Sequence, residues 1–301
     1  MKHRTVRSNR ELPMHLMLLP GVILVLIFSY FPMAGIVIAF QNFIPSLGFS
    51  RSEWVGLDNF RYVLSLPDTL QVFWNTIYIS ALKIAAGLAV PVTVALLLNE
   101  LGKKWFKGLM QTLIYVPHFL SWVILGGILI DVLSPSQGLV NQVLSLFGFD
   151  PIYFLGDNSW FPNTLIVTNT WKEFGFGTIV YLAALTGLNP NLYEAAMIDG
   201  AGRWKQTLHI TLPGIIPVVV LMATLSLGHV LNAGFDQVFN LYSPVVYQSG
   251  DIIDTMVYRI GLVQAQFGVA TAVGLLKSVV SFLLISVCYW LAYRFANYQI
   301  F

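Results

Sequence analysis

The hydrophilic stretch 189–213 carries residues suited to contact between proteins. Asn189 precedes Pro190, a pair typical of a helix start, because an asparagine side chain caps the helix and proline needs no N–H in the first turn. Gly200 permits a sharp turn. We expect a second helix to follow and to end near Pro213. The stretch is thus predicted to form a helix, a turn and a second helix.

Small and charged residues lie together in this stretch. Ala195 and Ala196 would let the backbone of another protein approach closely, and Glu194 would form charged contacts beside them. The residues assigned to this docking surface are Glu194, Ala195, Ala196, Asp199, Gly200 and Arg203. An interfacial helix that covers the inner ends of membrane spans explains the same residues equally well.

A second polar stretch, 232–242, interrupts an apolar block with amides, a carboxylate and aromatic rings. Sugars bind to such a mixture, because hydroxyls pair with polar groups and the apolar faces of the sugar rings stack on aromatic rings. Irregular backbone at membrane depth is tolerated where it lines a cavity. The candidate solute contacts are Asn232, Phe235, Asp236, Gln237, Phe239, Asn240 and Tyr242. The alternative is the start of an outer loop with an interfacial aromatic belt.

Four charged residues, Lys83, Lys172, Glu173 and Lys277, fall within apolar segments. Such residues usually face a cavity or a charged partner. The three lysines are therefore added to the candidate solute path. Lys172 and Glu173 are adjacent, so we expect them to point in different directions and Glu173 to neutralise a lysine of another span. The lysines favour an acidic solute such as a uronate oligosaccharide, although helix pairing explains them equally well.

The elements that must position these residues are membrane spans. Of 301 residues, 56% are hydrophobic and only 10% are charged, against roughly 25% charged in soluble domains. The apolar residues form blocks of the length that a bilayer requires. We predict an all-α polytopic membrane protein with about six transmembrane helices in one domain, 1–301. The predicted spans are 14–40, 76–98, 109–133, 162–185, 214–231 and 267–295. The outer segment 41–75 is expected to contain a short helix near 60–66.

The basic residues give the predicted orientation. The long first apolar block indicates an uncleaved span rather than a signal peptide. Placing both termini in the cytoplasm leaves three basic residues outside, which satisfies the positive-inside rule. The inner residues are Lys2, Arg4, Arg7, Arg10, Lys103, Lys104, Lys107, Arg203, Lys205 and Arg294, and the outer ones are Arg51, Arg61 and Arg259.

The sequence offers little for catalysis. It contains no HExxH, GxSxG or paired-aspartate motif, and no GxxxxGK[ST] phosphate loop. His118 and His229 each stand alone, and Cys288 is the only cysteine. We therefore predict no catalytic residue, no metal site and no cofactor bound by this chain.

A family resemblance decides between the two interpretations of residues 189–213. The stretch resembles the EAA motif of permease subunits in binding-protein-dependent ABC importers, and it does so through Glu194, Ala195, Ala196, Gly200, Ile210, Leu212 and Pro213. The similarity extends over most of the chain and looks closest to the oligosaccharide and polysaccharide branch, with its maltose-type and alginate permeases. It implies a type I ABC importer permease fold. It also implies that this loop forms the coupling helices that enter a groove of an ATP-binding subunit.

The same resemblance implies the partners. Two ATP-binding subunits would bind ATP and Mg²⁺ and hydrolyse the nucleotide, so this chain would not be an enzyme. A second homologous permease, more often a distinct one, would complete the path, and an extracytoplasmic solute-binding protein would deliver the sugar. The location implied is the bacterial cytoplasmic (inner) membrane, among lipid and without nucleic acid. Two alternatives remain, an ion-coupled secondary transporter and a membrane-embedded enzyme.

Overall fold

The computed structural model describes the backbone of residues 8–296 and the side chains of 13–287, 289 and 290. The predictions for Lys2, Arg4, Arg7, Arg10, Cys288 and Arg294 concern side chains outside these described residues. The chain forms two compact units. Unit 1 contains residues 1–66 and 257–275, and unit 2 contains residues 67–256 and 276–301.

Unit 1 holds the first apolar segment and an outer hairpin. Its elements are α1 (Ser8–Val25), a π-helical turn (Leu26–Tyr30), a 3₁₀ helix (Phe31–Phe40), β1 (Gln41–Asn42), α2 (Gly48–Arg51), β2 (Glu53–Trp54) and α3 (Asp58–Ser65). The two strands pair antiparallel, with Gln41 opposite Trp54. Helix α3 confirms the short helix expected near 60–66.

Unit 2 is built around long helices. Its elements are α4 (Thr69–Asn99), α5 (Lys104–Tyr115), a 3₁₀ helix (Val116–Phe119), α6 (Trp122–Val132), α7 (Leu139–Leu146), α8 (Phe161–Thr186), α9 (Pro190–Ile198), α10 (Arg203–Gln206), a π-helical turn (Thr207–Thr211), α11 (Leu212–Leu227), α12 (Phe235–Leu241), a 3₁₀ turn (Pro244–Val246) and α13 (Tyr247–Gly250). Two further elements cross between the units: α14 (Ile253–Tyr258) and α15 (Phe267–Ala296). A π-helical turn (Arg259–Val263) between them lies in unit 1.

Four helices of the described chain are long and apolar enough to cross a membrane: Pro13–Phe40, Thr69–Asn99, Arg203–Leu227 and Phe267–Val287. A bent pair of helices would make a fifth. The remaining predicted span corresponds to α8. Its 26 residues would reach about 39 Å, but Thr164, Thr168 and Lys172 lower its apolarity, and their side chains are buried within the protein.

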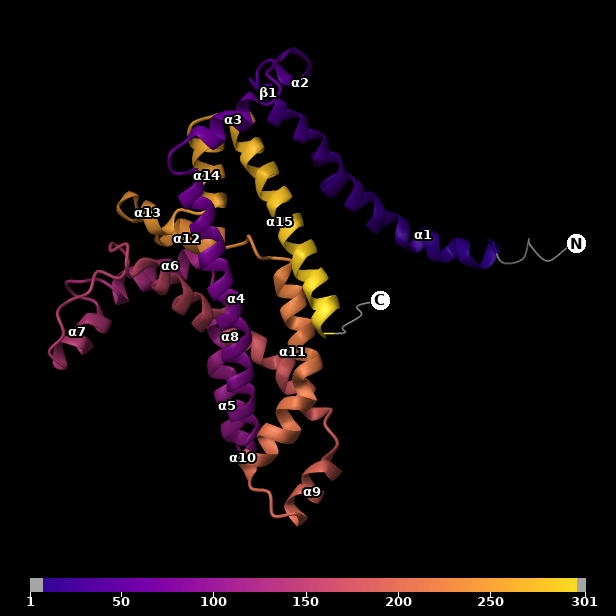
Figure 1. Cartoon of the computed structure of the whole chain (residues 1–301), viewed down its shortest axis with the longest axis vertical. Helices are drawn as coiled ribbons and strands as arrows, with labels where there is room; N and C mark the ends of the chain where they lie inside the picture. Colours follow the sequence, from indigo (N-terminus) through magenta and orange to yellow (C-terminus); the bar gives the residue numbers. More distant parts are fainter. Residues whose placement is uncertain (1–7, 297–301) are drawn as a thin grey trace, which may run out of the picture. The chain divides into compact units, whose positions relative to one another are not determined.

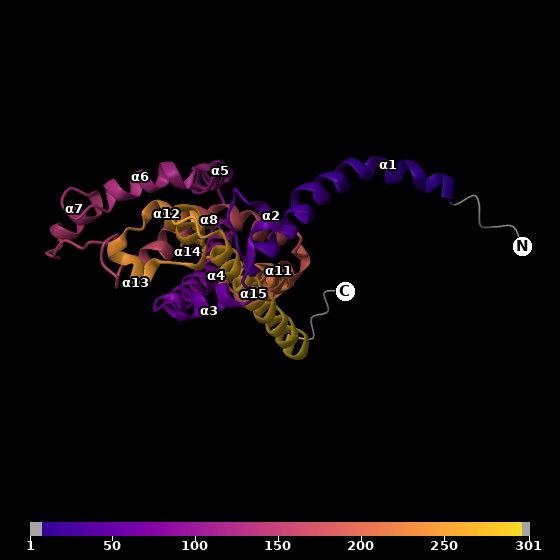
Figure 2. The same cartoon turned by 90° about the horizontal axis from the view of Figure 1, so that it is seen from above.

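The span predicted at 109–133 is not one straight helix. Lys104–Phe119 and Trp122–Val132 meet at an angle of 103°. Figure 2 shows α6 leaving the end of α5 in a new direction. Pro117 cannot donate a backbone hydrogen bond, and Ser121 Oγ accepts from Ile124 N at 3.3 Å, which caps the new helix. A local helix start therefore interrupts a continuous apolar run.

The prediction that a helix ends near Pro213 is also wrong. The helical backbone runs from Arg203 to Leu227 through the π-helical turn at Thr207–Thr211. Helix α11 begins at Leu212, so Pro213 occupies its first turn, where a missing N–H costs little. The hydrophilic loop is therefore joined to a membrane span without a break.

Two apolar clusters hold unit 2 together. One contains Ile79, Leu125, Phe161 and Val238, and so joins α4, α6, α8 and α12. The other joins the opposite ends of α4 and α8 to α11 through residues that include Ile215. Figure 1 shows α4, α8 and α11 side by side, as their contacts require. These helices form the frame on which both candidate sites are placed.

Candidate functional site

The first candidate site is the loop that contains α9 and α10. Asn189 Oδ1 accepts a hydrogen bond from Asn191 N at 3.0 Å, and Pro190 is the first helical residue. Gly200 has φ of +75°, a left-handed conformation that favours glycine. The predicted helix start and sharp turn are both confirmed.

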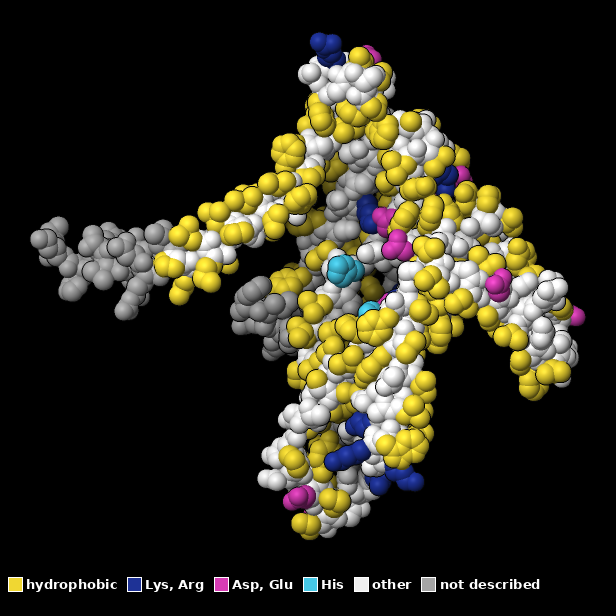
Figure 3. All heavy atoms as spheres, turned by 180° about the vertical axis from the view of Figure 1, so that it is seen from behind, with side chains coloured by type: hydrophobic (Ala, Val, Ile, Leu, Met, Phe, Trp, Pro, Cys, Tyr) yellow, Lys and Arg dark blue, Asp and Glu magenta, His cyan; other side chains and the backbone are white. Residues whose placement is uncertain are grey.

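This loop exposes an unusual mixture of side chains. Ile198 is 86% exposed and Trp204 is 75% exposed, in a segment that also carries charge. The predicted docking residues Glu194, Ala195, Asp199, Gly200 and Arg203 are exposed, and Ala196 is half-buried. Lys and Arg side chains gather at the end of unit 2 that carries α9 and α10 (Figure 3). Apolar and charged groups exposed together are typical of a protein-binding surface.

One contact ties this loop to the preceding helices. Arg203 Nη1 lies 3.4 Å from Glu100 Oε2, at the end of α4 and four residues before α5 begins. The pair is largely exposed, so it adds little to stability. It nevertheless places the loop beside the junction of α4 and α5.

The second candidate site surrounds Lys83, which is 8% exposed. Lys83 Nζ donates to Ala233 O at 2.6 Å and to Gln237 Oε1. Gln237 Nε2 in turn donates to Leu165 O and Thr168 Oγ, each at 2.8 Å. The network joins α4, α8 and α12 around one ammonium group.

Gly234 allows the close approach that this network needs. Its φ is +89°, and a Cβ atom there would lie 3.2 Å from Lys83 Nζ. A larger residue would be strained in its backbone and crowded against the ammonium. The interruption between α11 and α12 thus serves to bring Ala233 O to Lys83.

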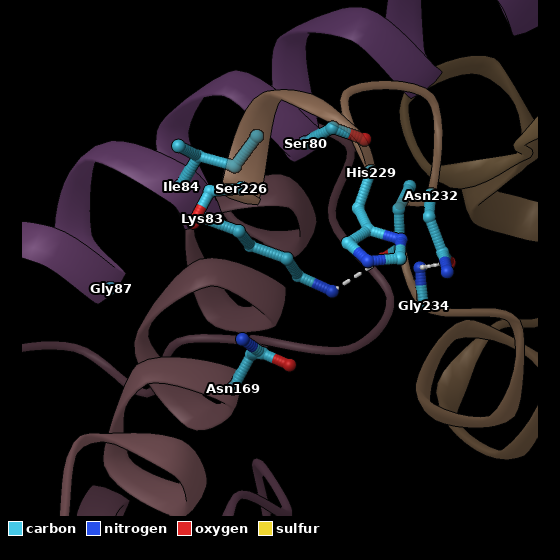
Figure 4. Close-up of a pocket in the computed structure, with 10 residues that line it drawn as sticks. Ser80, Lys83, Ile84, Gly87, Asn169, Ser226, His229, Asn232 and Gly234 are labelled. Carbon is cyan, nitrogen blue, oxygen red and sulfur yellow. Dashed lines mark hydrogen bonds between the residues drawn. The ribbon is translucent and has the colours of Figure 1, made fainter. Parts of the chain in front are cut away.

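A pocket of about 240 Å³ opens beside Lys83. Figure 4 shows Lys83 extending from α4 towards the segment with His229, and Asn169 reaching the same space from α8. The lining residues are Ser80, Lys83, Ile84, Gly87, Asn169, Ser226, His229, Asn232, Ala233 and Gly234. None of these described residues is acidic. A buried cation with uncharged partners favours an anionic ligand, because the ligand's charge offsets the cost of burial.

The structure brings some of the predicted solute contacts to this pocket. Asn232 lines it beside Lys83, and Gln237 holds Lys83 in place. The other predicted residues of this stretch lie on or just after α12, away from the lining: Phe235, Asp236, Phe239, Asn240 and Tyr242. Phe235 and Phe239 stack on each other at 5.2 Å.

Sequence reasoning missed four polar lining residues, Ser80, Asn169, Ser226 and His229. A signal for two of them was present. Ser226, His229 and Asn232 recur every three residues through an otherwise apolar segment, which is the spacing of one helix face. Such a polar series points to a cavity even where each residue alone does not.

Lys172 belongs to a separate cluster at the bend between α5 and α6. Its Nζ donates to His118 O and to Glu173 Oε1, both at 2.9 Å. Glu173 Oε2 lies 2.7 Å from His118 Nδ1. The expectation that Lys172 and Glu173 point in different directions is wrong, because both reach His118 at the end of a helix, where carbonyl groups need outside donors. His118 also stacks on Phe176, 4.3 Å away.

Lys277 pairs with the carboxylate of Asp254. Both side chains are about three-quarters buried, at 23% and 25% exposed. Helix pairing therefore accounts for this lysine, and its place on a solute path stays a prediction.

We expect Glu173→Gln to destabilise the bend. Lys172 is 8% exposed in its side chain and would lose its carboxylate partner, although Glu173 itself is 41% exposed. The expected loss is about 1–2 kcal/mol, or roughly 2–6 °C in Tm. Thermal unfolding of the protein in lipid nanodiscs measures it. The control is Asp58→Asn, whose pair with Arg61 is 68% and 78% exposed. Equal shifts in both variants would contradict a clamp at the bend.

Comparisons with known proteins agree on one family. The model described as "Binding-protein-dependent transport system inner membrane component" matches residues 84–297. The polygalacturonan/rhamnogalacturonan transport system permease protein YteP of Bacillus subtilis (strain 168) is 44% identical over 300 residues, covering 100% of this chain and 94% of the relative. Protein LplB of the same organism is 40% identical and covers 97% and 92%.

A solved structure agrees with these relatives. It is the crystal structure of a bacterial ABC transporter involved in the import of the acidic polysaccharide alginate, which matches with a TM-score of 0.88 and 38% identity over 97% of this chain and 99% of that chain. A second structure, of the alginate transporter with an alginate pentasaccharide-bound periplasmic protein, has a TM-score of 0.88 and 37% identity over 99% and 100%. The chain therefore belongs to the family of binding-protein-dependent transport system inner membrane components, and it is a membrane permease of an ABC importer.

Proposed function

We propose that this permease carries an acidic oligosaccharide and that the pocket beside Lys83 receives one of its sugar units. The observation that carries the proposal is the buried Lys83 ammonium in a polar pocket whose described lining has no acidic residue. Two similar proteins support this proposal. One is a transporter involved in the import of alginate, an acidic polysaccharide. The other, YteP, has polygalacturonan in its name, and polygalacturonan consists of uronate units.

The lining has the groups that a uronate unit needs. The ammonium of Lys83 would pair with the carboxylate, and the amides of Asn169 and Asn232 would bind hydroxyls. The pocket, at about 240 Å³, is smaller than the roughly 300–1,000 Å³ of typical ligand sites. One sugar unit would fit, and a second, homologous permease would enclose the rest of the chain. We favour a distinct permease over a second copy.

The energy source in this proposal lies outside the chain. Two ATP-binding subunits would dock on the coupling loop 189–213 of this transmembrane domain, bind ATP with Mg²⁺ and hydrolyse it. A solute-binding protein would release the sugar at the outer face. The distribution of basic residues supports an inner-membrane orientation with both termini in the cytoplasm. Membership of this family argues against the ion-coupled transporter and the membrane-embedded enzyme.

The test compares sugars that differ at C6, where one carries a carboxylate and the other a neutral hydroxymethyl group. The importer is assembled in proteoliposomes and supplied with its solute-binding protein. ATP-driven uptake is then measured for trigalacturonate and for neutral galactotriose. We expect preference for the acidic sugar by at least about tenfold, the value of one charge-assisted hydrogen bond. Equal uptake of both sugars would overturn the assignment of an acidic solute.

Variants of α12 are expected to show a moderate loss of uptake. Asn240 Nδ2 donates to Asp236 O at 2.7 Å, and Asp236 is exposed. Asp236→Ala and Asn240→Ala should each lower uptake by about 2- to 10-fold, the value of a hydrogen bond, while copurification of the ATP-binding subunit stays unchanged. Normal uptake in both variants would remove α12 from the solute path.

A further inference from the structure

A second polar pocket, of about 420 Å³, lies where α4 and α8 begin and α13 packs against both. It is lined by Gln71, Trp74, Asn75, Tyr78, Asn158, Ser159, Pro162, Gln248 and Ser249. The lysines of residues 103–107 follow the opposite end of α4, so the positive-inside rule places this pocket on the outer side of the membrane. Solute arrives on that side.

We infer that this outer pocket is a second saccharide-binding site, separate from the pocket beside Lys83. That the ligand is a saccharide rests on the proposed function, whereas the existence of the site rests on the geometry of the pocket. Trp74 and Lys83 are nine residues apart on α4, which at about 100° per residue puts them on opposite faces of the helix. The two pockets therefore cannot be parts of one cavity along the same face of α4.

The wall of the outer pocket is held in place by hydrogen bonds. Asn75, 4% exposed, donates to Gln248 O at 3.0 Å and Asp251 O at 3.2 Å, and accepts from Gln71 Nε2 at 2.8 Å. Asn158 donates to Val245 O at 3.1 Å and accepts from Ser249 Oγ at 2.8 Å. A wall fixed before the ligand arrives lowers the entropic cost of binding.

Two aromatic rings stand beside this wall. Trp74 is 62% exposed and Tyr78 is 40% exposed, and their separation of four residues places them next to each other on the helix surface. Aromatic faces stack on the apolar faces of pyranose rings. An interfacial aromatic belt would explain two exposed rings, but it requires no ordered set of amides beside them.

The charge of the outer pocket differs from that of the Lys83 pocket. None of its nine described lining residues is charged. The neighbouring carboxylate of Asp157 accepts hydrogen bonds from Ser159, which lower its pKa and keep it ionised. The site therefore recognises hydroxyls and ring faces, and it binds a neutral sugar at least as well as an acidic one.

The experiment measures binding rather than transport. Saturation-transfer NMR follows digalacturonate and neutral galactobiose on the assembled importer in nanodiscs, without solute-binding protein. We expect both sugars to bind, and Trp74→Ala and Gln248→Ala to weaken binding of galactobiose by about fivefold or more. The matched control is Trp160→Ala, since Trp160 is 43% exposed near the same helix end and does not line the pocket.

The outcomes separate this inference from the proposed function. Absence of galactobiose binding, or equal weakening by Trp74→Ala and Trp160→Ala, would overturn the outer site. So would loss of all binding in Lys83→Met, because a single site would then explain every signal. A third outcome would separate the two claims: the importer binds galactobiose in a way that depends on Trp74, but it shows no preference for acidic sugars in uptake. That result would overturn the proposal of an acidic solute and would leave the outer site supported.

Discussion

Gly200→Val should abolish ATP-driven uptake while the protein remains folded in the membrane. Gly200 has φ of +75°, and no atom lies within 4 Å of a Cβ built there. The Cβ atom of valine therefore meets open space, and the main effect is on the backbone, at a cost of at least about 1–2 kcal/mol for a β-branched residue. The turn after α9 would change shape and misplace the surface that we assign to the ATP-binding subunit.

The chain offers a matched control two residues away. Gly202 has φ of −69° and likewise has open space around a Cβ atom, so Gly202→Val should retain most activity. Copurification of the ATP-binding subunit and ATP-dependent uptake are measured for both variants. Equal activity of the two valine variants would show that the turn geometry is not needed for coupling.

Charge reversal in the same loop tests the contact without changing the backbone. Glu194 is exposed on α9, so Glu194→Lys should fold normally and reduce association with the ATP-binding subunit by about tenfold or more, as for a charge pair at an interface. Unchanged association and uptake would refute the assignment of residues 189–213 to coupling.

Lys83→Met should remove the preference for acidic sugars. The ammonium is lost while most of the apolar stem is kept, so a carboxylate in the pocket would lose its charged partner. We expect uptake of trigalacturonate to fall by about 10- to 100-fold, and uptake of galactotriose to fall much less. Ala233 O and Gln237 Oε1 would also lose their donor, which should lower stability by about 1–3 kcal/mol.

Two further lysine variants separate charge from structure. Lys83→Arg keeps the charge and should keep part of the acidic preference. Lys277→Met removes a lysine that is paired with Asp254 and should leave the ratio of acidic to neutral uptake unchanged. A common loss of both uptakes in Lys83→Met would show that Lys83 only supports the fold.

Local chemistry explains which parts of the fold could be predicted. The start of α9 depends on Asn189 and Pro190, and the turn depends on Gly200, so neighbouring residues decide these features. The bend at Ser121 was missed because the apolar character continues on both sides of it. Pro213 was misjudged because the unwound turn before it, which shifts the helix start to Leu212, has no signature in the sequence.

The site was only partly predictable for a related reason. Lys83 could be recognised from the sequence, because a charged residue within a membrane span is energetically costly in any orientation of its side chain. Asn169 and His229 are ordinary residues until packing brings α8 and the end of α11 to the same pocket. The contact of His118 with Glu173 joins residues 55 positions apart, and such pairings follow from tertiary packing rather than from local pattern.

The bend between α5 and α6 lies between the two candidate sites and contacts elements of both. Helix α5 begins next to the Glu100–Arg203 contact, and α6 packs on α12, where a side chain on Gly126 would lie 3.2 Å from Asn240 Cβ. Helix α12 carries Gln237, which holds Lys83. His118, Lys172 and Glu173 contact one another at this bend of 103°. A continuous series of contacts therefore runs from the loop of α9 and α10 to the pocket beside Lys83.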